Sequence, residues 1–314
     1  MTIKKIILIF NHVMLNLIQH LVRPRNKFGV TLFVSFLIFN SAEGNDTGTS
    51  AGLLLRISPA AKTSAMAEAV TSLAENLASL DFNPAAISNL PDYNFSFSHI
   101  EYFEDVNFED MKFSTYIHKI RGNVGLALKY LSSKDVERDE RGIGRNEFLN
   151  SDTVVGISYA RKIYPLDTGI TVKYLNENLA GEKAQAFAAD LGLIYSGYNL
   201  PFEIGFSARN FGTKISFGGE KDSLPSELRI GISRNFARLL LSVDGIRQRE
   251  NIFIGNLGIE LHPVKNFKLR GGYTTLKRYS IGAGFSAKII SVDYSFTSHE
   301  KLTDIHRFTL NCKF

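Results

Sequence analysis

The sequence has no tryptophan, a single cysteine and only 8 prolines in 314 residues. The lone Cys312 excludes an intrachain disulfide framework and any metal site built from several cysteines. What the chain has instead is 24 Phe, 12 Tyr and 25 Gly. This composition favours β-strands joined by many tight turns.

Most of the chain also lacks an excess of either charge. Lys and Arg number 36 against 31 Asp and Glu, which gives a net charge of +5, but +4 of this lies in residues 1–44. The remaining residues carry only +1. They offer no basic surface for a phosphate backbone, so nucleic acid is excluded as a partner.

Beyond residue 44 the chain contains no apolar run of ~18 residues, the length that a membrane-spanning helix needs. This excludes a helical membrane protein. The 12 uncharged residues 28–39 are too few for such a helix, but they fit the apolar core of a secretory signal peptide, and basic residues precede them at 23–27. The chain is therefore expected to be exported.

The predicted leader spans residues 1–44, with the apolar run and the cleavage site in 28–44. Small residues at Ala42 and Gly44 favour cleavage before Asn45, and cleavage after Ala42 is the alternative. Residues 1–27 fit either a start site placed too far upstream or one unusually long signal.

The chain after the leader alternates apolar and polar residues with the period of a β-strand. In one segment Phe202, Ile204 and Phe206 share a face, while Glu203 and Arg209 lie on the opposite one. Such strands have one apolar face and one small or polar face. We expect fourteen of them, near residues 93–103, 111–117, 123–130, 153–161, 169–175, 186–195, 202–209, 227–235, 238–244, 252–261, 266–273, 279–287, 289–297 and 306–314.

Two architectures explain this alternation: a soluble sandwich that is apolar inside, and a membrane barrel that is apolar outside. The even number of strands favours the barrel. The connections favour it too, because those after odd-numbered strands are predicted to be long and those after even-numbered strands short. The long connections are expected at 132–152, 176–185 and 210–226 and the short ones at 163–168, 235–237 and 263–265.

The predicted fold class is therefore all-β: a 14-stranded antiparallel transmembrane β-barrel over residues 93–314, in the bacterial outer membrane. Outer-membrane lipid then surrounds the wall, and the long connections lie outside the cell. The final strand ends on an aromatic residue and resembles the signal that the barrel-assembly machinery reads. The residues of this signal are Phe308, Leu310 and Phe314, with Cys312 as a small hydrophobe on the same face.

Residues 45–92 precede the barrel and differ from it in composition. A four-residue spacing of alanine and leucine from Ala65 to Leu77 predicts a helix over 58–80. Pro84 stops this helix, because proline lacks an N–H donor and forces the residue before it towards extended geometry. The segment is either an arm lying on a soluble sheet or, in a wide barrel, a partly helical plug that fills the lumen.

Four short motifs resemble the opening of the PorV/PorQ family of outer-membrane proteins, which belongs to the wider FadL-type (fatty-acid-transporter-like) barrels. The match covers about residues 47–103, and the remainder agrees in strand pattern only. The chain departs from the family at Ala67-Glu68, where a glycine pair is usual, and at Ala86, where glycine is frequent. The motifs are residues 48–57 (GTSAGLLLRI), 65–69 (AMAEA), 83–85 (NPA) and 95–99 (FSFSH).

The resemblance implies a fourteen-stranded barrel with an N-terminal hatch, in which Asn83, Pro84 and Ala85 are the matching hatch turn. Some members of the family carry substrate proteins or serve as shuttles in type IX secretion, and FadL-type relatives pass hydrophobic molecules. The expected partners are accordingly a hydrophobic ligand or secreted proteins.

Ten charged residues fall on the polar faces of their predicted strands. Burial in a soluble core would cost several kcal/mol for each unless it were paired, whereas in a barrel lumen they can pair with one another or meet plug and water. Salt bridges that stiffen the barrel explain any single one better than a substrate path does. These lumen-facing candidates are Lys129, Lys173, Asp190, Glu203, Arg209, Arg229, Asp244, Lys268, Arg270 and Asp293.

An outer-membrane enzyme is the remote alternative. It needs an acid/base pair or a nucleophile, but His99, His118 and His262 stand singly, and the nearest approach to a cluster, at 299–306, fits a solvated loop. We therefore expect no catalytic residue, no metal site and no cofactor.

Two functions remain. One is the binding or passage of a hydrophobic small molecule across the outer membrane, which predicts an apolar pocket between plug and wall. The other is a non-transport role in protein secretion or surface attachment, which predicts a partner surface on the external connections 132–152 and 211–226.

Overall fold

The computed structural model describes residues 51–74, 76–101, 106–138, 144–197, 200–298 and 304–314. The predicted leader 1–44 and its cleavage site lie outside these residues. None of the helices in the described part of the chain is long and apolar enough to cross a membrane.

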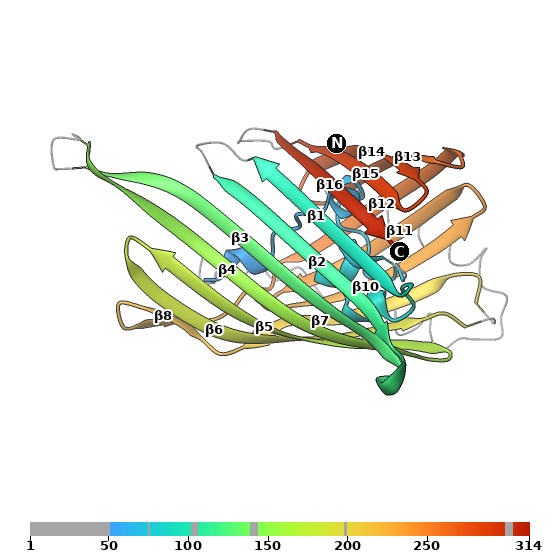
Figure 1. Cartoon of the computed structure of the whole chain (residues 1–314), viewed down its shortest axis with the longest axis horizontal. Coiled ribbons are helices and arrows are strands. Elements are labelled where there is room, and N and C mark those ends of the chain that lie inside the picture. Colours follow the sequence, from blue (N-terminus) through green and yellow to red (C-terminus); the bar gives the residue numbers. More distant parts are fainter. Residues whose placement is uncertain (1–50, 75, 102–105, 139–143, 198–199, 299–303) are drawn as a thin grey trace. The chain divides into compact units, whose positions relative to one another are not determined.

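Fourteen antiparallel strands close into a barrel (Figure 1), which confirms the predicted fold class. β1 pairs with β16 to close the sheet. A separate hairpin of β8 (Ile215–Phe217) and β9 (Glu220–Asp222) lies between β7 and β10 in the chain. The strands of the wall are β1 (Tyr93–Glu101), β2 (Asn107–Ile117), β3 (Gly122–Arg138), β4 (Gly144–Ile163), β5 (Leu166–Leu179), β6 (Glu182–Tyr195), β7 (Glu203–Gly212), β10 (Glu227–Phe236), β11 (Leu239–Gln248), β12 (Phe253–Val264), β13 (Phe267–Thr274), β14 (Arg278–Ala287), β15 (Ile290–Thr297) and β16 (Ile305–Lys313).

Two of the three predicted long connections are wrong, because the strands continue through them. β3 runs to Arg138 and β4 starts at Gly144, so most of 132–152 is paired backbone. In the same way β5 ends at Leu179 and β6 starts at Glu182. The charged residues of these segments suggested loops, but hydrogen bonds between strands satisfy the backbone whatever the side chains are.

The two ends of the barrel are named here by their connections. The end that carries the β3–β4, β5–β6 and β7–β10 connections is called the long rim, after the longest of these, the β7–β10 connection. The opposite end carries the β2–β3, β4–β5 and β14–β15 connections and is called the turn rim. A short 3-10 turn, η4 (His118–Ile120), forms the β2–β3 connection.

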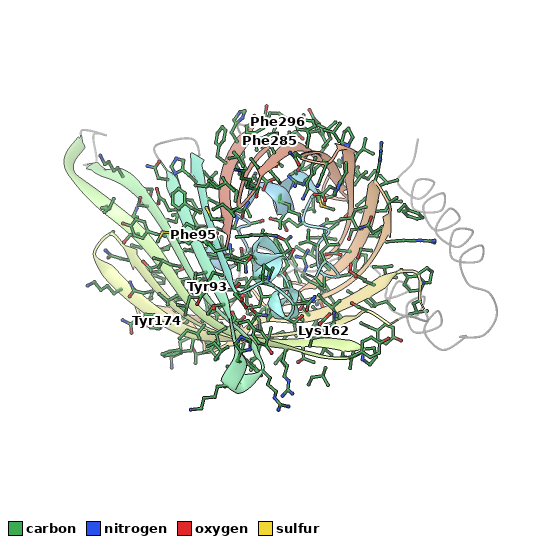
Figure 2. The ribbon with its side chains drawn as sticks, turned by 45° about the vertical axis from the view of Figure 1, so that its right-hand side comes forward. Tyr93, Phe95, Lys162, Tyr174, Phe285 and Phe296 are labelled. Carbon is green, nitrogen blue, oxygen red and sulfur yellow. The ribbon has the colours of Figure 1, made fainter. Side chains whose placement is uncertain are left out.

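The wall is apolar outside and polar inside. On β3 and β4, Leu126 and Ile157 lie on the outer face and are 47% and 58% exposed, whereas Lys129 and Ser158 lie on the inner face and are 5% and 2% exposed. Figure 2 shows Phe285 on the outer face of the wall. This pattern confirms the membrane barrel over the soluble sandwich.

Residues 51–92, the inner segment, contain much less helix than predicted. The helix expected over 58–80 is wrong beyond α3 (Ala61–Ala65). Ala67 and Glu68 adopt φ angles of 47° and 62°, in the left-handed region that a continuing helix does not use.

The wall forms hydrogen bonds with the backbone that would have continued this helix. The N–H groups of Val70 and Thr71 each donate to the Asp244 carboxylate of β11 at 3.1 Å. Tertiary hydrogen bonds therefore override the local helix propensity. The helical elements in the other described residues of the inner segment are short 3-10 turns: η1 (Leu53–Leu55), η2 (Leu77–Asp81) and η3 (Pro84–Ile87).

Hydrogen bonds tie the inner segment to separate parts of the wall. The Ala61 N–H donates to Thr309 Oγ1 of β16 at 2.9 Å, and Ser88 Oγ donates to Asp167 of β5 at 2.8 Å. Together with Asp244 of β11, these partners lie far apart around the closed sheet. The inner segment therefore lies against the inner face of the barrel.

Gly192 of β6 is expected to resist substitution, because the inner segment lies directly on it. A Cβ there would overlap Asn83 Oδ1 and lie 2.8 Å from Pro84 Cδ. Gly192→Ala should lower the free energy of unfolding by about 1–3 kcal/mol, the usual cost of overpacking. Urea unfolding in lipid vesicles measures this change. Gly271→Ala on β13 is the control, since a Cβ there meets no atom within 4 Å; an equal loss in both variants would contradict the close approach.

Candidate functional site

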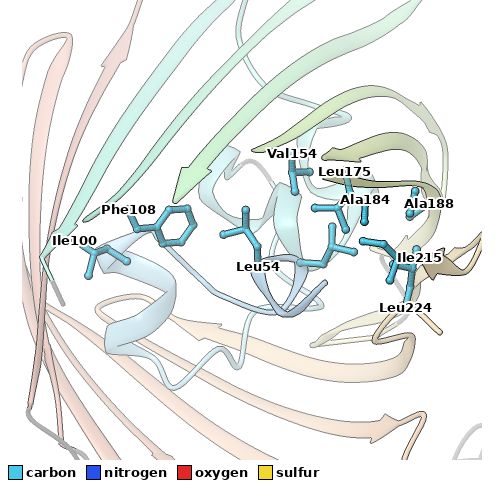
Figure 3. Packing of buried hydrophobic residues seen from close by; sticks show 11 residues of the cluster. Leu54, Ile100, Phe108, Val154, Leu175, Ala184, Ala188, Ile215 and Leu224 are labelled. Carbon is cyan, nitrogen blue, oxygen red and sulfur yellow. The ribbon is translucent and has the colours of Figure 1, made fainter. Parts of the chain in front are cut away.

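Apolar side chains gather inside the barrel at the long rim, in an interior that is otherwise rich in polar groups. They come from the inner segment, from β1, β2, β4, β5, β6 and β8, and from the stretch after β9 (Figure 3). We call this group the apolar cluster. Its buried members are Leu54, Leu55, Ile100, Phe108, Val154, Leu175, Ala184, Ala186, Ala188, Ile215 and Leu224.

β6 contributes only small side chains to the apolar cluster. Its even-numbered residues face inward, and Ala184, Ala186 and Ala188 are at most 4% exposed. Leu54 and Leu55 of η1 supply large apolar side chains from the inner segment. The apolar cluster thus combines small side chains from β6 with large ones from the inner segment.

β1 and β2 contribute one pair of large apolar side chains at the long rim. Ile100 and Phe108 are directly paired across the two strands, and both are fully buried. Burial of a side chain of this size contributes roughly 1.5–3 kcal/mol. The apolar cluster is therefore also a stabilising contact between wall and inner segment.

Ion pairs surround Phe82 of the inner segment. Glu227 of β10 accepts from Arg209 of β7 and, at 3.2 Å, from Arg229. Arg229 also lies 3.3 Å from the Asp244 carboxylate. The guanidinium carbons of Arg209 and Arg229 are 5.1 and 4.7 Å from the centre of the Phe82 ring, a cation–π arrangement. Two charged wall residues thus lie within cation–π distance of one aromatic ring of the inner segment, and both pair with the Glu227 carboxylate.

This charged layer is continuous with the apolar cluster. Arg209 Nη2 donates to the carbonyl oxygen of Leu55 at 3.2 Å, so one wall residue contacts both. The apolar cluster at the long rim therefore borders on paired charges of the wall.

A second ion-pair group fixes η2. Asp81 lies 2.8 Å from Lys112 of β2 and 2.9 Å from Lys129 of β3, and Lys112 also contacts Asp110 at 2.5 Å. Burial by itself would raise the pKa of the Asp81 carboxyl, but the two ammonium groups outweigh it and hold this pKa well below its usual range. Asp81 is therefore a charged anchor of the inner segment.

The structure places the ten predicted inward charges as follows. Eight are buried, and Glu203 and Lys268 are half-buried. Lys129 pairs with Asp81, and Arg209 pairs with Glu227. The other six pair among themselves: Lys173 with Asp190 at 2.5 Å, Arg229 with Asp244 at 3.3 Å, and Arg270 with Asp293 at 2.6 Å.

The residues of the predicted hatch turn are all buried and start η3. Asn83 is extended, with φ −152°, and its Oδ1 accepts from the Ala85 N–H at 3.0 Å. Asn83 Nδ2 donates to the carbonyl oxygens of Thr71 at 2.7 Å and Leu193 of β6 at 3.2 Å. Asn83 and Pro84 therefore link the inner segment to β6.

The predicted C-terminal signal lies on the outer face of β16. Phe308, Leu310 and Phe314 are 55%, 41% and 67% exposed. β16 pairs with both β1 and β15, so it is the strand that closes the wall. His299 lies outside the described residues, and His306 is hydrogen-bonded to Tyr294 at 2.8 Å.

Sequence reasoning missed the two partners from outside this set, Asp81 for Lys129 and Glu227 for Arg209. Asp81 and Phe82 were assigned only to a helix end, and Asp110 lies before the predicted start of its strand at 111. Extension of the β2 alternation backwards from Lys112 would have placed Asp110 and Phe108 on the inner face. No pattern in the sequence indicates that the Phe82 ring lies within about 5 Å of two arginines.

The cavities of the described residues are small or polar. A cavity of about 20 Å³ lies between the inner segment and β3–β5, lined by Leu55, Leu80 and Val154 among others. A cavity of about 240 Å³ lies at the turn rim and is lined by several charged residues. Neither cavity is the open apolar pocket predicted for a transporter, because the first is too small and the second is lined by charged residues.

A closed, fourteen-stranded wall that is apolar outside and charged inside defines a bacterial outer-membrane β-barrel. No protein-family model matches the chain, and no curated protein is similar to it in sequence.

Solved structures with a similar fold include two hydrocarbon transporters. The toluene transporter TbuX of Ralstonia pickettii has a TM-score of 0.55 at 14% identity, over 82% of this chain and 98% of that one. The toluene transporter TodX of Pseudomonas putida has a TM-score of 0.55 at 13% identity, over 79% and 95%. At these identities the similarity shows the fold alone.

Asp244 is expected to hold the inner segment to the wall. Asp244→Ala leaves Arg229 without this carboxylate and removes the acceptor of Val70 N, Thr71 N and, at 2.6 Å, Thr71 Oγ1. Removing one partner of a buried ion pair costs about 3–5 kcal/mol. We expect a loss of that order in urea unfolding and faster protease cleavage within residues 66–74.

Ser242→Ala is the matched control for this experiment. Ser242 lies on the same strand and the same face, is 1% exposed, and its hydroxyl has no hydrogen-bond partner in the described residues. Its removal should change the unfolding free energy by less than about 1 kcal/mol. Unchanged protease sensitivity in the Asp244 variant would contradict the anchoring role.

Proposed function

We propose that the protein is an outer-membrane channel that binds and passes a hydrophobic small molecule. In this proposal the apolar cluster is the part of the lumen that receives the molecule, and the inner segment is the plug. The observation that carries the proposal is the position of the apolar cluster. It faces inward at the long rim, beside the ion pair of Arg209 and Glu227, and has more members than either of the two other buried apolar groups in the described residues.

Apolar side chains that face a water-filled lumen are unfavourable, because apolar surface is then exposed to water. Barrel lumens are therefore usually polar, and an apolar group inside one serves either packing or the binding of an apolar molecule. The cluster meets the wall through the small side chains of β6, which admit a ligand more readily than large ones would. The structural neighbours TbuX and TodX, named as toluene transporters, support the same chemistry. Small apolar pockets with few polar groups are the usual sites of such ligands.

The structure represents a closed state in this proposal. Leu55 packs in the cluster and also lines the 20 Å³ cavity between plug and wall. Movement of η1 away from β4 and β5 would open the apolar cluster and connect it with this cavity. The ligand would then pass along the β3–β5 side of the plug, where the cavity already separates the two layers.

A large side chain placed in the apolar cluster at β6 tests the proposed channel. Ala186→Phe fills the apolar cluster, and we expect it to reduce toluene uptake at least about tenfold in Gram-negative cells that lack other hydrocarbon channels. Ala189→Phe is the matched control, because Ala189 lies on the outer face of the same strand and is half-buried. Uptake that is equal in both variants and the unmodified protein would contradict the channel, provided that all three are folded at equal levels in the outer membrane.

A second candidate is a PorV/PorQ-like role in protein secretion or surface attachment. The packed, ion-paired interior favours it, because such a barrel needs no open passage. The motif resemblance over residues 47–103 also supports membership in that family. The β8–β9 hairpin, with Glu220, Lys221 and Asp222 exposed, is the described part of the external surface that this role would use.

This second role predicts a secreted partner at the long rim. Cross-linking from a photoreactive residue at Lys221, in the native host, should then capture a secreted protein. The same group placed at Lys119 on the turn rim is the control and should not capture it. Identical cross-linked products at both positions would contradict a secretion role, whereas the toluene uptake experiment is unaffected by this outcome.

A further inference from the structure

The polar cavity at the turn rim is separate from the apolar cluster and has a chemistry of its own. It occupies about 240 Å³ between α3, the start of β13, the β14–β15 turn and the end of β16. A water molecule fills about 30 Å³ of the liquid, so this space holds several waters or a small hydrated ion. The charged residues that line it are Lys62, Lys268, Arg270, Lys288, Lys313 and Asp293. We call it the basic pocket.

The acidic group in the lining of the basic pocket is already neutralised. Asp293 Oδ1 accepts from Arg270 Nη1 at 2.6 Å, and its Oδ2 accepts from Asn311 Nδ2 at 3.0 Å. Arg270 Nε in turn donates to Glu260 of β12 at 2.6 Å. Arg270 is therefore balanced by two carboxylates. Glu260 also acts electrostatically on Lys62, but within the described residues no carboxylate contacts any of the four lysines of the pocket.

The four lysines have no such partners. Within the described residues none of their ammonium groups forms an ion pair or a hydrogen bond. The terminal carboxylate of Phe314, at the same rim, does not pair with them either. They come from three separate places: Lys62 from α3, Lys268 from β13, and two from the ends of strands at the rim. The two rim lysines are Lys288, in the β14–β15 turn, and Lys313, at the end of β16.

The fold holds one of these lysines where like charges crowd it. The hydrogen bond from Ala61 N–H to Thr309 Oγ1 fixes the start of α3 on β16, and Lys62 is the next residue. Burial, opposed by Glu260 and reinforced by Arg270, lowers the pKa of Lys62 to about 8. A cation withdrawn from water beside another cation is unfavourable unless an anion completes the site.

We propose that the basic pocket binds a phosphate-type oxyanion, either as free phosphate or as the phosphodiester of a lipid head group. A phosphate presents several acceptor oxygens and carries one to two negative charges, so it can contact ammonium groups that converge from several directions. Lysine binds phosphate as a point charge and needs no planar geometry. The pocket opens at a rim of a transmembrane wall, which is the level of lipid head groups.

The experiment measures phosphate binding by the full chain, purified in a maltoside detergent that has no phosphate of its own. Phosphorus NMR at low ionic strength follows inorganic phosphate, because salt screens such contacts. We expect saturable binding to the unmodified protein. The double variant Lys62→Gln with Lys268→Gln should raise the Kd for inorganic phosphate about tenfold or more.

Lys119→Gln combined with Lys162→Gln is the matched control. Both residues lie on the same rim, exposed and away from the basic pocket, so the net charge changes equally. Retention of binding in the control and loss in the pocket variant supports the proposal. Equal loss in both variants, or no saturable binding to the unmodified protein, overturns it. Neither pocket lysine has a structural partner in the described residues, so both variants are expected to fold, which urea unfolding checks.

A second arm distinguishes the source of the phosphate. Short-chain phosphatidylglycerol is titrated against protein saturated with inorganic phosphate. Displacement at concentrations well below those of inorganic phosphate assigns the basic pocket to a lipid head group, and the same pocket variant must then lose lipid binding. Failure to displace assigns it to the free anion.

Discussion

The constraint on which the structure depends is that lipid cannot hydrogen-bond a polypeptide backbone. A closed sheet satisfies every strand from its neighbours, and the pairing of β1 with β16 removes the last free edge. Closure then forces a division of side chains, because each strand presents alternate residues to lipid and to the lumen. Most of the charges that cannot face lipid pair with one another, and their arrangement decides how the lumen is filled.

The inner segment is held by this enforced proximity of charges. Asp81 supplies a carboxylate between two wall lysines, and Asp244 supplies one to two backbone N–H groups of the segment. Such contacts are strong only while water is excluded, since the same ion pairs at a surface contribute little. The segment and the wall therefore stabilise each other. At Val70 and Thr71 the backbone conformation of the segment is set by a wall carboxylate and not by the helical spacing of its sequence.

The wall was largely predictable from the sequence because its period of two is imposed residue by residue. Alternation at 202–209 and along β14 and β15 places each strand correctly, since a shift of one residue would put charges into lipid. Strand ends were less predictable. The β3–β4 pairing continues beyond Ser132 because the two backbones hydrogen-bond there, which charged side chains do not reveal.

The site was predictable only in part. The inward charges could be named, because each lies on the polar face of its strand. Their partners could not, because Asp81, Glu227 and Phe82 meet them through the closure of the sheet and not through local spacing. The apolar cluster was also missed, since Ile100 and Phe108 lie at strand ends and their inward direction depends on register.

The lengths of the strands have a further consequence for the surrounding membrane. β3 and β4 contain 17 and 20 residues, whereas β13 and β15 contain 8 each. A strand needs about 9–11 residues to cross the hydrocarbon layer. The bilayer is therefore expected to be compressed next to β13 and β15 and undisturbed next to β3 and β4, so that the protein sits tilted in a membrane of uneven thickness.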